Sequence, residues 1–231
     1  MFPVQTKSTV RIGEIRRDGT DARDGPVAAG TLRPENRPVE FVERRQMLES
    51  LRGKGVVESE SGELVHLSIE PARRGGLVQL TARGGDGAPD GAIVVEVPAD
   101  RLAATLEAAI HKFHLFPLYL VPAARWRAIF ATVAFGLAAN PQWTEIDSEA
   151  TVELNTRDPL LCDPAHLHVL RELVRVLLAE GGDDPANTLH LVAPGKTLLA
   201  RVTPGRPITI ECGDAGTAAA LAEAARHAVG G

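Results

Sequence analysis

Aromatic residues are scarce in this sequence, where Phe, Trp and Tyr make up 4% of 231 residues. A core with few rings must be built from Leu, Val, Ile and Ala, and few rings remain for stacking on bases or sugars. Basic residues are also not in surplus: 25 Lys and Arg stand against 30 Asp and Glu, for a formal net charge of −5. Because nucleic-acid-binding domains usually carry a basic surplus, we expect no nucleic-acid partner.

Cysteine and long apolar runs are lacking too. The two cysteines, Cys162 and Cys212, are far apart and form neither a CxxC nor a zinc-ligand pattern, so reduced thiols are expected. The longest apolar candidate, Trp126 to Ala139, contains Arg127 and is too short to span a bilayer. Residues 1–7 show no apolar signal segment. These features predict a cytoplasmic protein that does not insert into membranes.

Apolar periodicity and turn residues predict alternating strands and helices along the whole chain. Period-two patterns predict strands, and periods near 3.6 bounded by Gly or Pro predict helices. The expected strands are 9–16, 26–32, 63–69, 77–81, 93–97, 118–121, 151–155, 159–162, 188–192, 198–202 and 208–211. The expected helices are 39–52, 98–114, 122–139, 163–181 and 214–229.

The same order of elements is predicted twice. Thr9–Glu14 matches Thr151–Thr156, and each run is followed by an Arg-Asp turn, at Arg17-Asp18 and Arg157-Asp158. We therefore predict an α+β fold of two pseudo-repeated βαβββα modules, with antiparallel sheets and packed helices. The N-terminal module would span 1–114, and 115–231 would hold the second module preceded by the apolar connecting helix 122–139.

From Pro122 onward, the expected order is helix, two short strands, helix, three strands and helix. The run Asn187-Thr188-Leu189-His190-Leu191-Val192-Ala193-Pro194-Gly195-Lys196-Thr197-Leu198-Leu199-Ala200-Arg201-Val202 predicts two strands around a Gly turn, followed by Ile208–Glu211 and the final helix. This order resembles the roadblock family of dynein light chains, within the longin-like and profilin-like class. The resemblance implies non-enzymatic modules that dimerise, often as platforms for small GTPases or as motor adaptors. Type III secretion chaperones, which also bind proteins, offer a neighbouring comparison.

Few residues indicate catalytic or metal chemistry. The densest cluster of reactive side chains is Cys162 with His166 and His168. A catalytic thiolate needs a neighbouring base, which a histidine could supply. Asp163-Pro164 is also a good helix start, which would explain Asp163 by capping alone. His111 and His114 have metal-ligand spacing but no third ligand nearby, and a helix end explains them better. Gly195-Lys196-Thr197 lacks the first glycine and the following helix of a phosphate-binding loop. We therefore predict no catalytic residue, cofactor or metal.

The leading functional hypothesis is a non-enzymatic subunit that binds a protein partner or itself. Trp126, Phe130 and Phe135 on the apolar helix are the candidate partner-facing or interdomain residues. Arg73 and Arg74, at an expected hairpin tip, are candidates for contact with an acidic partner. The alternative is an enzyme or small-ligand binder with a cleft near Cys162, His166 and His168.

Overall fold

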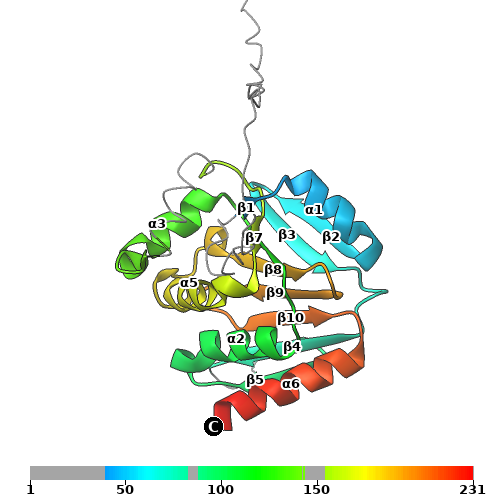
Figure 1. Ribbon diagram of the computed structural model, residues 1–231. Helices are drawn as coiled ribbons and strands as arrows, with labels where there is room; N and C mark the ends of the chain where they lie inside the picture. Colours follow the sequence, from blue (N-terminus) through cyan, green and yellow to red (C-terminus); the bar gives the residue numbers. More distant parts are fainter. Residues whose placement is uncertain (1–39, 83–87, 142, 144–153, 231) are drawn as a thin grey trace, which may run out of the picture. The chain divides into compact units, whose positions relative to one another are not determined.

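The computed structural model describes residues 40–82, 88–141, 143 and 154–230 (Figure 1). The chain divides into two units, residues 1–33 and residues 34–231, and every described residue belongs to the second. The strands predicted at 9–16 and 26–32, and residues 151–153 of a third, lie outside the described residues.

Within the described part, eight strands form one sheet in the order β1-β7-β6-β8-β9-β10-β4-β5. All neighbouring strands are antiparallel except β4 and β5, which are parallel. The strands are β1 (Glu40–Phe41), β4 (Gly76–Thr81), β5 (Ala92–Glu96), β6 (Leu118–Pro122), β7 (Leu160–Cys162), β8 (Leu189–Ala193), β9 (Leu198–Val202) and β10 (Ile208–Cys212). Strands from both predicted modules therefore share a single sheet.

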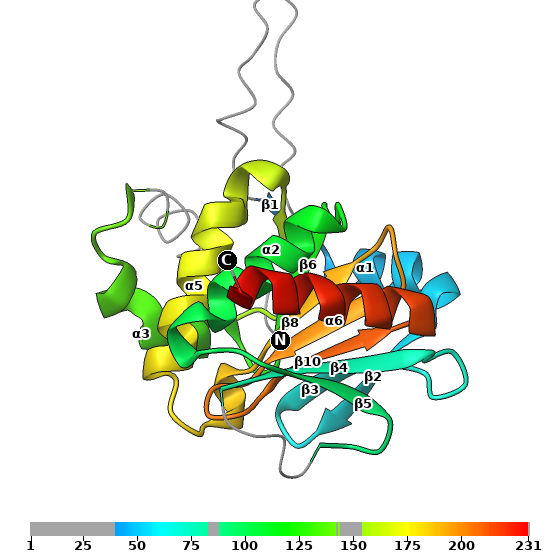
Figure 2. The same ribbon diagram turned by 90° about the horizontal axis from the view of Figure 1, so that it is seen from below.

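Helices cover one face of this sheet. They are α2 (Leu102–Lys112), α3 (Trp126–Leu137), α5 (Leu167–Glu180) and α6 (Ala215–Gly230), with the 3-10 turns η3 (Ala99–Arg101), η4 (Pro164–His166) and η5 (Pro185–Asn187) (Figure 2). Their buried stripes meet alternate strand residues such as Ile208 and Ile210 in one large apolar core. The core contains mostly Leu, Val, Ile and Ala, as the scarcity of aromatics requires.

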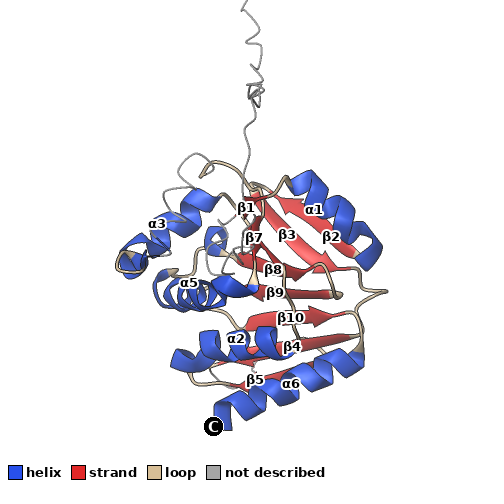
Figure 3. Ribbon diagram, in the orientation of Figure 1, coloured by secondary structure: helices blue, strands red, loops and turns tan. Residues whose placement is uncertain are grey.

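A second, thinner layer covers part of the opposite face. It contains α1 (Arg44–Leu51), the turn η2 (Arg52–Lys54) and a hairpin of β2 (Val56–Ser61) and β3 (Leu64–Ile69) (Figures 2 and 3). Met47 and Leu51 of α1 pack with the inward residues of the hairpin onto Val121, Val192 and Leu199 of the sheet. Because side chains alternate between faces, one strand such as β9 serves both cores: Leu198 faces the helices and Leu199 faces the hairpin.

The α+β class and the mostly antiparallel sheet are confirmed, and most predicted elements in the described part are present to within a few residues. Two strands were missed: β1, which falls inside the predicted helix 39–52, and β2, whose sequence Val-Val-Glu-Ser-Glu-Ser is mainly polar because only its first residues meet the core. The helix predicted from residue 39 begins at Arg44, after β1.

The predicted pseudo-repeat is not confirmed, and neither is the role of 122–139 as a connecting helix. The three strands β8, β9 and β10 are consecutive antiparallel neighbours. Their expected counterparts behave differently, since β3 pairs with β2 whereas β4 lies between β10 and β5. The predicted boundary between residues 114 and 115 stays a prediction.

Candidate functional site

The Cys162 cluster lies where β7 leads into α5. Cys162 is buried and lines a small apolar cavity of about 20 Å³ together with His166 and the rings of Trp126, Phe130 and Trp143. His168 is exposed and does not line it. The structure therefore brings Cys162 and His166 to one cavity and leaves His168 outside.

The local chemistry disfavours a nucleophilic cysteine. Burial, together with the smaller effect of the neighbouring Asp163 charge, raises the pKa of the Cys162 thiol to about 12. The thiol is therefore protonated at neutral pH. The Nδ1 atom of His166 accepts a hydrogen bond from the Asp163 N–H at 3.2 Å, and the Asp163 side chain accepts one from the His166 backbone. This reciprocal capping box starts the helix and gives Asp163 and His166 a structural role.

The candidate aromatic residues of α3 divide into two groups. Trp126 and Phe130 are buried, with ring centroids 5.7 Å apart, and the Trp126 indole N–H donates to Asp158 O at 2.7 Å. Phe135 is 91% exposed, and it is the one large exposed hydrophobic side chain found among the described residues. Of the three, only Phe135 is exposed at the surface of this chain, and its role in binding a partner stays a prediction.

Arg73 and Arg74 follow β3, in the connection to β4. The Arg73 guanidinium donates to Gly53 O at 2.9 Å and lies 3.4 Å from a Glu70 carboxylate oxygen. Arg74 lies 4.0 Å from the buried Glu211 carboxylate. Each arginine side chain is still about half exposed, at 54% and 40%, so both retain solvent-facing donors.

His111 and His114, at the end of α2, have ring centroids 6.4 Å apart. His114 has a φ of 49°, in the left-handed region that follows many helix ends. This geometry agrees with the interpretation of the pair as a helix terminus.

A mostly buried polar set, absent from the residues predicted as functional, lies between the sheet and the hairpin. His190, Arg201 and Glu211 stand on the neighbouring strands β8, β9 and β10, with His190 0% and Glu211 4% exposed. Each bonds the backbone of β3: Leu67 N–H donates to His190 Nε2 at 3.4 Å, Arg201 donates to Leu67 O at 3.0 Å, and Ile69 N–H donates to Glu211 Oε2 at 2.8 Å.

These bonds satisfy the edge of β3 that does not pair with β2. A strand edge buried without partners would be costly, because each unpaired buried amide costs about 1–3 kcal/mol. Burial, together with the smaller effect of the Arg201 charge, lowers the pKa of His190 to about 3, so the imidazole is neutral at neutral pH. Because its Nε2 accepts from Leu67, its Nδ1 carries the proton and donates to Val121 O at 3.3 Å. The set therefore anchors the hairpin.

Alternation was the one sequence signal that could have revealed this set. Each residue is a polar member of an otherwise mainly apolar strand, as in Leu-His-Leu-Val-Ala and Ile-Thr-Ile-Glu-Cys. Such a pattern normally indicates a solvent-facing side. Only the position of the hairpin shows that these side chains are covered.

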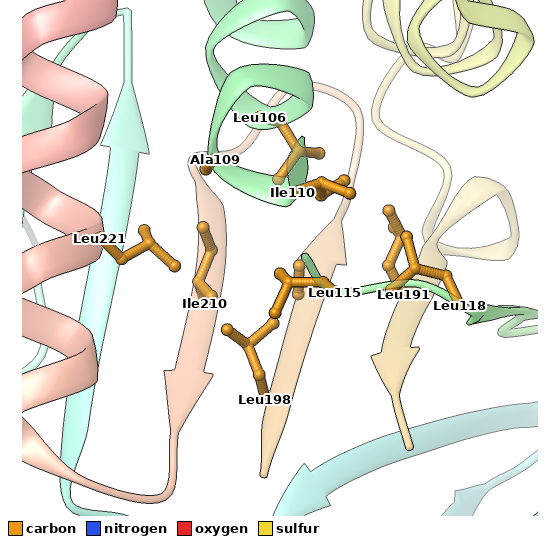
Figure 4. A pocket seen from close by; sticks show the side chains of 10 residues that line it. Leu106, Ala109, Ile110, Leu115, Leu118, Leu191, Leu198, Ile210 and Leu221 are labelled. Atoms are coloured by element: carbon orange, nitrogen blue, oxygen red, sulfur yellow. The ribbon is translucent and has the colours of Figure 1, made fainter. Parts of the chain in front are cut away.

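A wholly apolar cavity of about 10 Å³ lies under α2 and α6 (Figure 4). Leu106, Ala109 and Ile110 of α2, Leu221 of α6 and strand residues such as Leu198 surround it (Figure 4). This volume is at the lower limit for one water molecule, and the walls offer no polar partner. It is a packing gap between helices and sheet.

Within the described residues, no group of three or more His, Cys, Asp or Glu side chains is placed to hold a metal ion. The helices of that part are each too short or too polar to cross a bilayer. Comparisons of the sequence with known protein families, and searches of curated proteins and of solved structures, gave no match.

Proposed function

We propose that this chain is a non-enzymatic protein-interaction subunit that self-associates, with the outer edge of β5 as its pairing surface. The observation that carries the proposal is the position of β5: it ends the sheet, and no strand of the described part pairs with its outer edge. An unpaired strand edge presents a row of backbone donors and acceptors that can pair with another chain.

The direction of these backbone groups follows from the ladder with β4. Val97 N–H donates to Thr81 O at 2.8 Å, so the odd-numbered residues of this segment direct their backbone groups toward β4. Val94 and Glu96 then direct theirs outward. Ala92 also faces outward, but its N–H is already bonded to Pro89 O at 3.1 Å.

These outward groups suit antiparallel pairing of two copies about a two-fold axis at Val94. The two Val94 residues would exchange N–H and C=O bonds, and each Glu96 N–H would reach the free Ala92 carbonyl of the other copy. Glu96 would stand opposite Ala92, so no like charges face each other across the seam. The strand, Ala-Ile-Val-Val-Glu, contains no Pro or Lys to block pairing.

The two ends of the sheet differ in this respect. At the other end, β1 pairs with β7 over two residues only, and such a short edge is a poor template for pairing with another chain.

Within the proposal, the two predicted modules are halves of one folded unit, because their strands share the sheet. A cytoplasmic location and an origin by duplication remain part of the proposal.

Light scattering after size exclusion tests the pairing. We expect the full chain to elute at twice its 24.6 kDa mass and Val94→Pro to elute as a monomer, because proline removes the outward N–H and leaves the ladder to β4 intact. Val94→Thr keeps the N–H and should stay dimeric. Val94→Lys, which places two ammonium groups at the axis, serves as a second disrupting variant in case the proline variant does not fold.

A wild-type chain that is monomeric at every concentration would overturn the proposal. The proposal would also be overturned if Val94→Lys and a folded Val94→Pro variant both remained dimeric. Phe135→Asp provides the control for a different interface: α3 contacts β1 through the Trp126 and Phe41 rings, 6.1 Å apart, and β1 lies at the opposite end of the sheet from β5. A dimer lost in Phe135→Asp but kept in Val94→Lys would place the interface on α3 instead.

A further inference from the structure

A polar cleft of about 610 Å³ opens where several loops meet at one end of the sheet. It is lined by the turn before β2, the β3–β4 connection, the β8–β9 turn and the start of α6, through Lys54, Arg73, Lys196, Thr197, Asp214 and Thr217. Its volume is in the range of small-molecule sites. No large apolar side chain lines it, so the cleft suits a polar ligand.

Three cationic side chains from three separate segments line this cleft. Lys54 is half-buried, and among the described residues its ammonium group has no hydrogen-bond or ion-pair partner. Lys196 uses one donor on Phe113 O at 3.0 Å. The Arg73 guanidinium donates to Gly53 O at 2.9 Å and lies 3.4 Å from a Glu70 carboxylate oxygen. Each retains further N–H donors. This local cationic group stands out on a chain whose net charge is −5.

Close contacts hold together the loops that meet at the cleft. A Cβ atom on Gly75 would lie 2.5 Å from Asp214 Cα, and one on Gly213 would lie 2.6 Å from Thr197 Cβ. The Gly213 N–H also donates to Thr197 O at 2.8 Å, and the Gly75 N–H donates to Cys212 O at 2.9 Å. Only glycine permits such contacts, so the loops that carry the cations are fixed relative to one another before a ligand arrives.

Two carboxylates oppose the cations: Glu70, which lies 3.4 Å from Arg73, and Asp214 in the lining itself. Asp214 caps α6, accepting from Thr217 N–H at 2.7 Å and from the Thr217 hydroxyl at 2.6 Å. These bonds hold the pKa of Asp214 below its ordinary value, so it is ionised at neutral pH. The lining residues carry three positive charges against one negative charge, and the balance stays positive when Glu70, outside the lining, is included. Replacing Asp214 therefore tests the sign of the ligand's charge.

From the cleft, its cations and its closely packed loops, we infer that this site binds a small polar anion bearing more than one phosphate group. A multiply charged anion engages Lys54, Arg73 and Lys196 together, whereas a single phosphate reaches fewer of them. The site differs from a phosphate-binding loop, because Lys196 acts with cations from other loops and the helix start is occupied by its own cap.

Titration calorimetry of the full-length chain with pyrophosphate tests the inference. We expect saturable binding that weakens with added salt, and weaker binding of inorganic phosphate. Lys54→Ala and Lys196→Ala should each weaken pyrophosphate binding about tenfold, the loss typical of one charged contact. Lys112→Ala, which removes the same charge from an exposed position outside the cleft, is the matched control and should bind like wild type.

Asp214→Asn should change pyrophosphate binding in the opposite direction from the two lysine variants. Asparagine still caps a helix but carries no charge, so binding should tighten severalfold. The inference is overturned if pyrophosphate does not bind at millimolar concentration. It is also overturned if Lys112→Ala weakens binding as much as the two cleft variants do, or if Asp214→Asn leaves binding unchanged.

Discussion

The two faces of the sheet are held by different chemistry. On the helix side, α2, α3, α5 and α6 bury an almost entirely apolar core. On the hairpin side, a smaller apolar cluster is joined by His190, Arg201 and Glu211, which bond the backbone of β3. The same strands supply both faces, because alternate residues point in opposite directions.

The difference has a simple physical origin. Helices satisfy their own backbone hydrogen bonds, so they need only apolar contact with the sheet. A two-stranded hairpin has two unpaired edges, and burying one requires partners for its amides. The hairpin side therefore depends on a few buried polar groups, whereas the helix side depends on many apolar contacts.

The largest expected effect comes from breaking the polar anchor. Glu211→Ala removes the acceptor of the Ile69 N–H and the carboxylate beside Arg201. We expect a loss of about 4 kcal/mol in the free energy of unfolding, measured by urea denaturation, because a buried amide and a charge lose their partner. Glu211→Gln, which keeps an acceptor, should lose less. A loss below about 1 kcal/mol in Glu211→Ala would show that the anchor is not needed.

Leu198 and Leu199 offer a matched test of the two cores, since both are buried leucines of β9 that face opposite sides. Each change to Ala should cost about 3 kcal/mol by loss of buried apolar contacts. Hydrogen exchange should separate them. Leu199→Ala should speed exchange selectively in residues 56–69, and Leu198→Ala should speed it across the sheet. Identical exchange patterns would contradict the assignment of separate cores.

The buried His190 should make stability depend on pH. Its pKa is about 3 in the folded protein and about 6.5 when unfolded, so the unfolded chain binds a proton between these values and the folded protein does not. This contribution is fully present above pH 6.5 and is lost as the pH falls toward 3. From pH 7 to pH 5 we expect a loss of about 2 kcal/mol from this residue.

Urea titrations of wild type and His190→Gln at both pH values measure this effect. Glutamine does not titrate, so the variant should show a pH dependence smaller by that amount, whatever its stability at pH 7. An equal pH dependence in both proteins would mean that His190 is accessible to protons in the folded state.

The smallest effect concerns the packing gap on the helix side. Ala200 lines the apolar cavity of about 10 Å³ and lies in a strand, where valine is favoured. Ala200→Val should raise the melting temperature and increase the free energy of unfolding by under about 1 kcal/mol. Ala193→Val, on the same side but away from the cavity, should destabilise by overpacking. A reversed order would show that the gap is not available to added methyl groups.

The sequence predicted individual helices and strands better than it predicted which strands pair with one another. Strands such as 198–202, bounded by Pro-Gly turns, follow from period and turn chemistry. The strand β2 was missed because five of its six residues have little core contact and no apolar alternation. The candidate residues were separated only by packing: Trp126 and Phe130 turn inward and Phe135 outward, on a helix whose apolar residues cover much of its circumference.

The sequence by itself determined the α+β class, the main helices and the apolar character of the core, because these depend on local periodicity and composition. Tertiary structure alone decided that both predicted modules share one sheet, that β5 ends it within the described residues, and that His190 and Glu211 are buried beneath the hairpin. It also brought Lys54, Arg73 and Lys196 to one cleft. These outcomes depend on which strands pair across long sequence separations, and local sequence patterns do not determine that pairing.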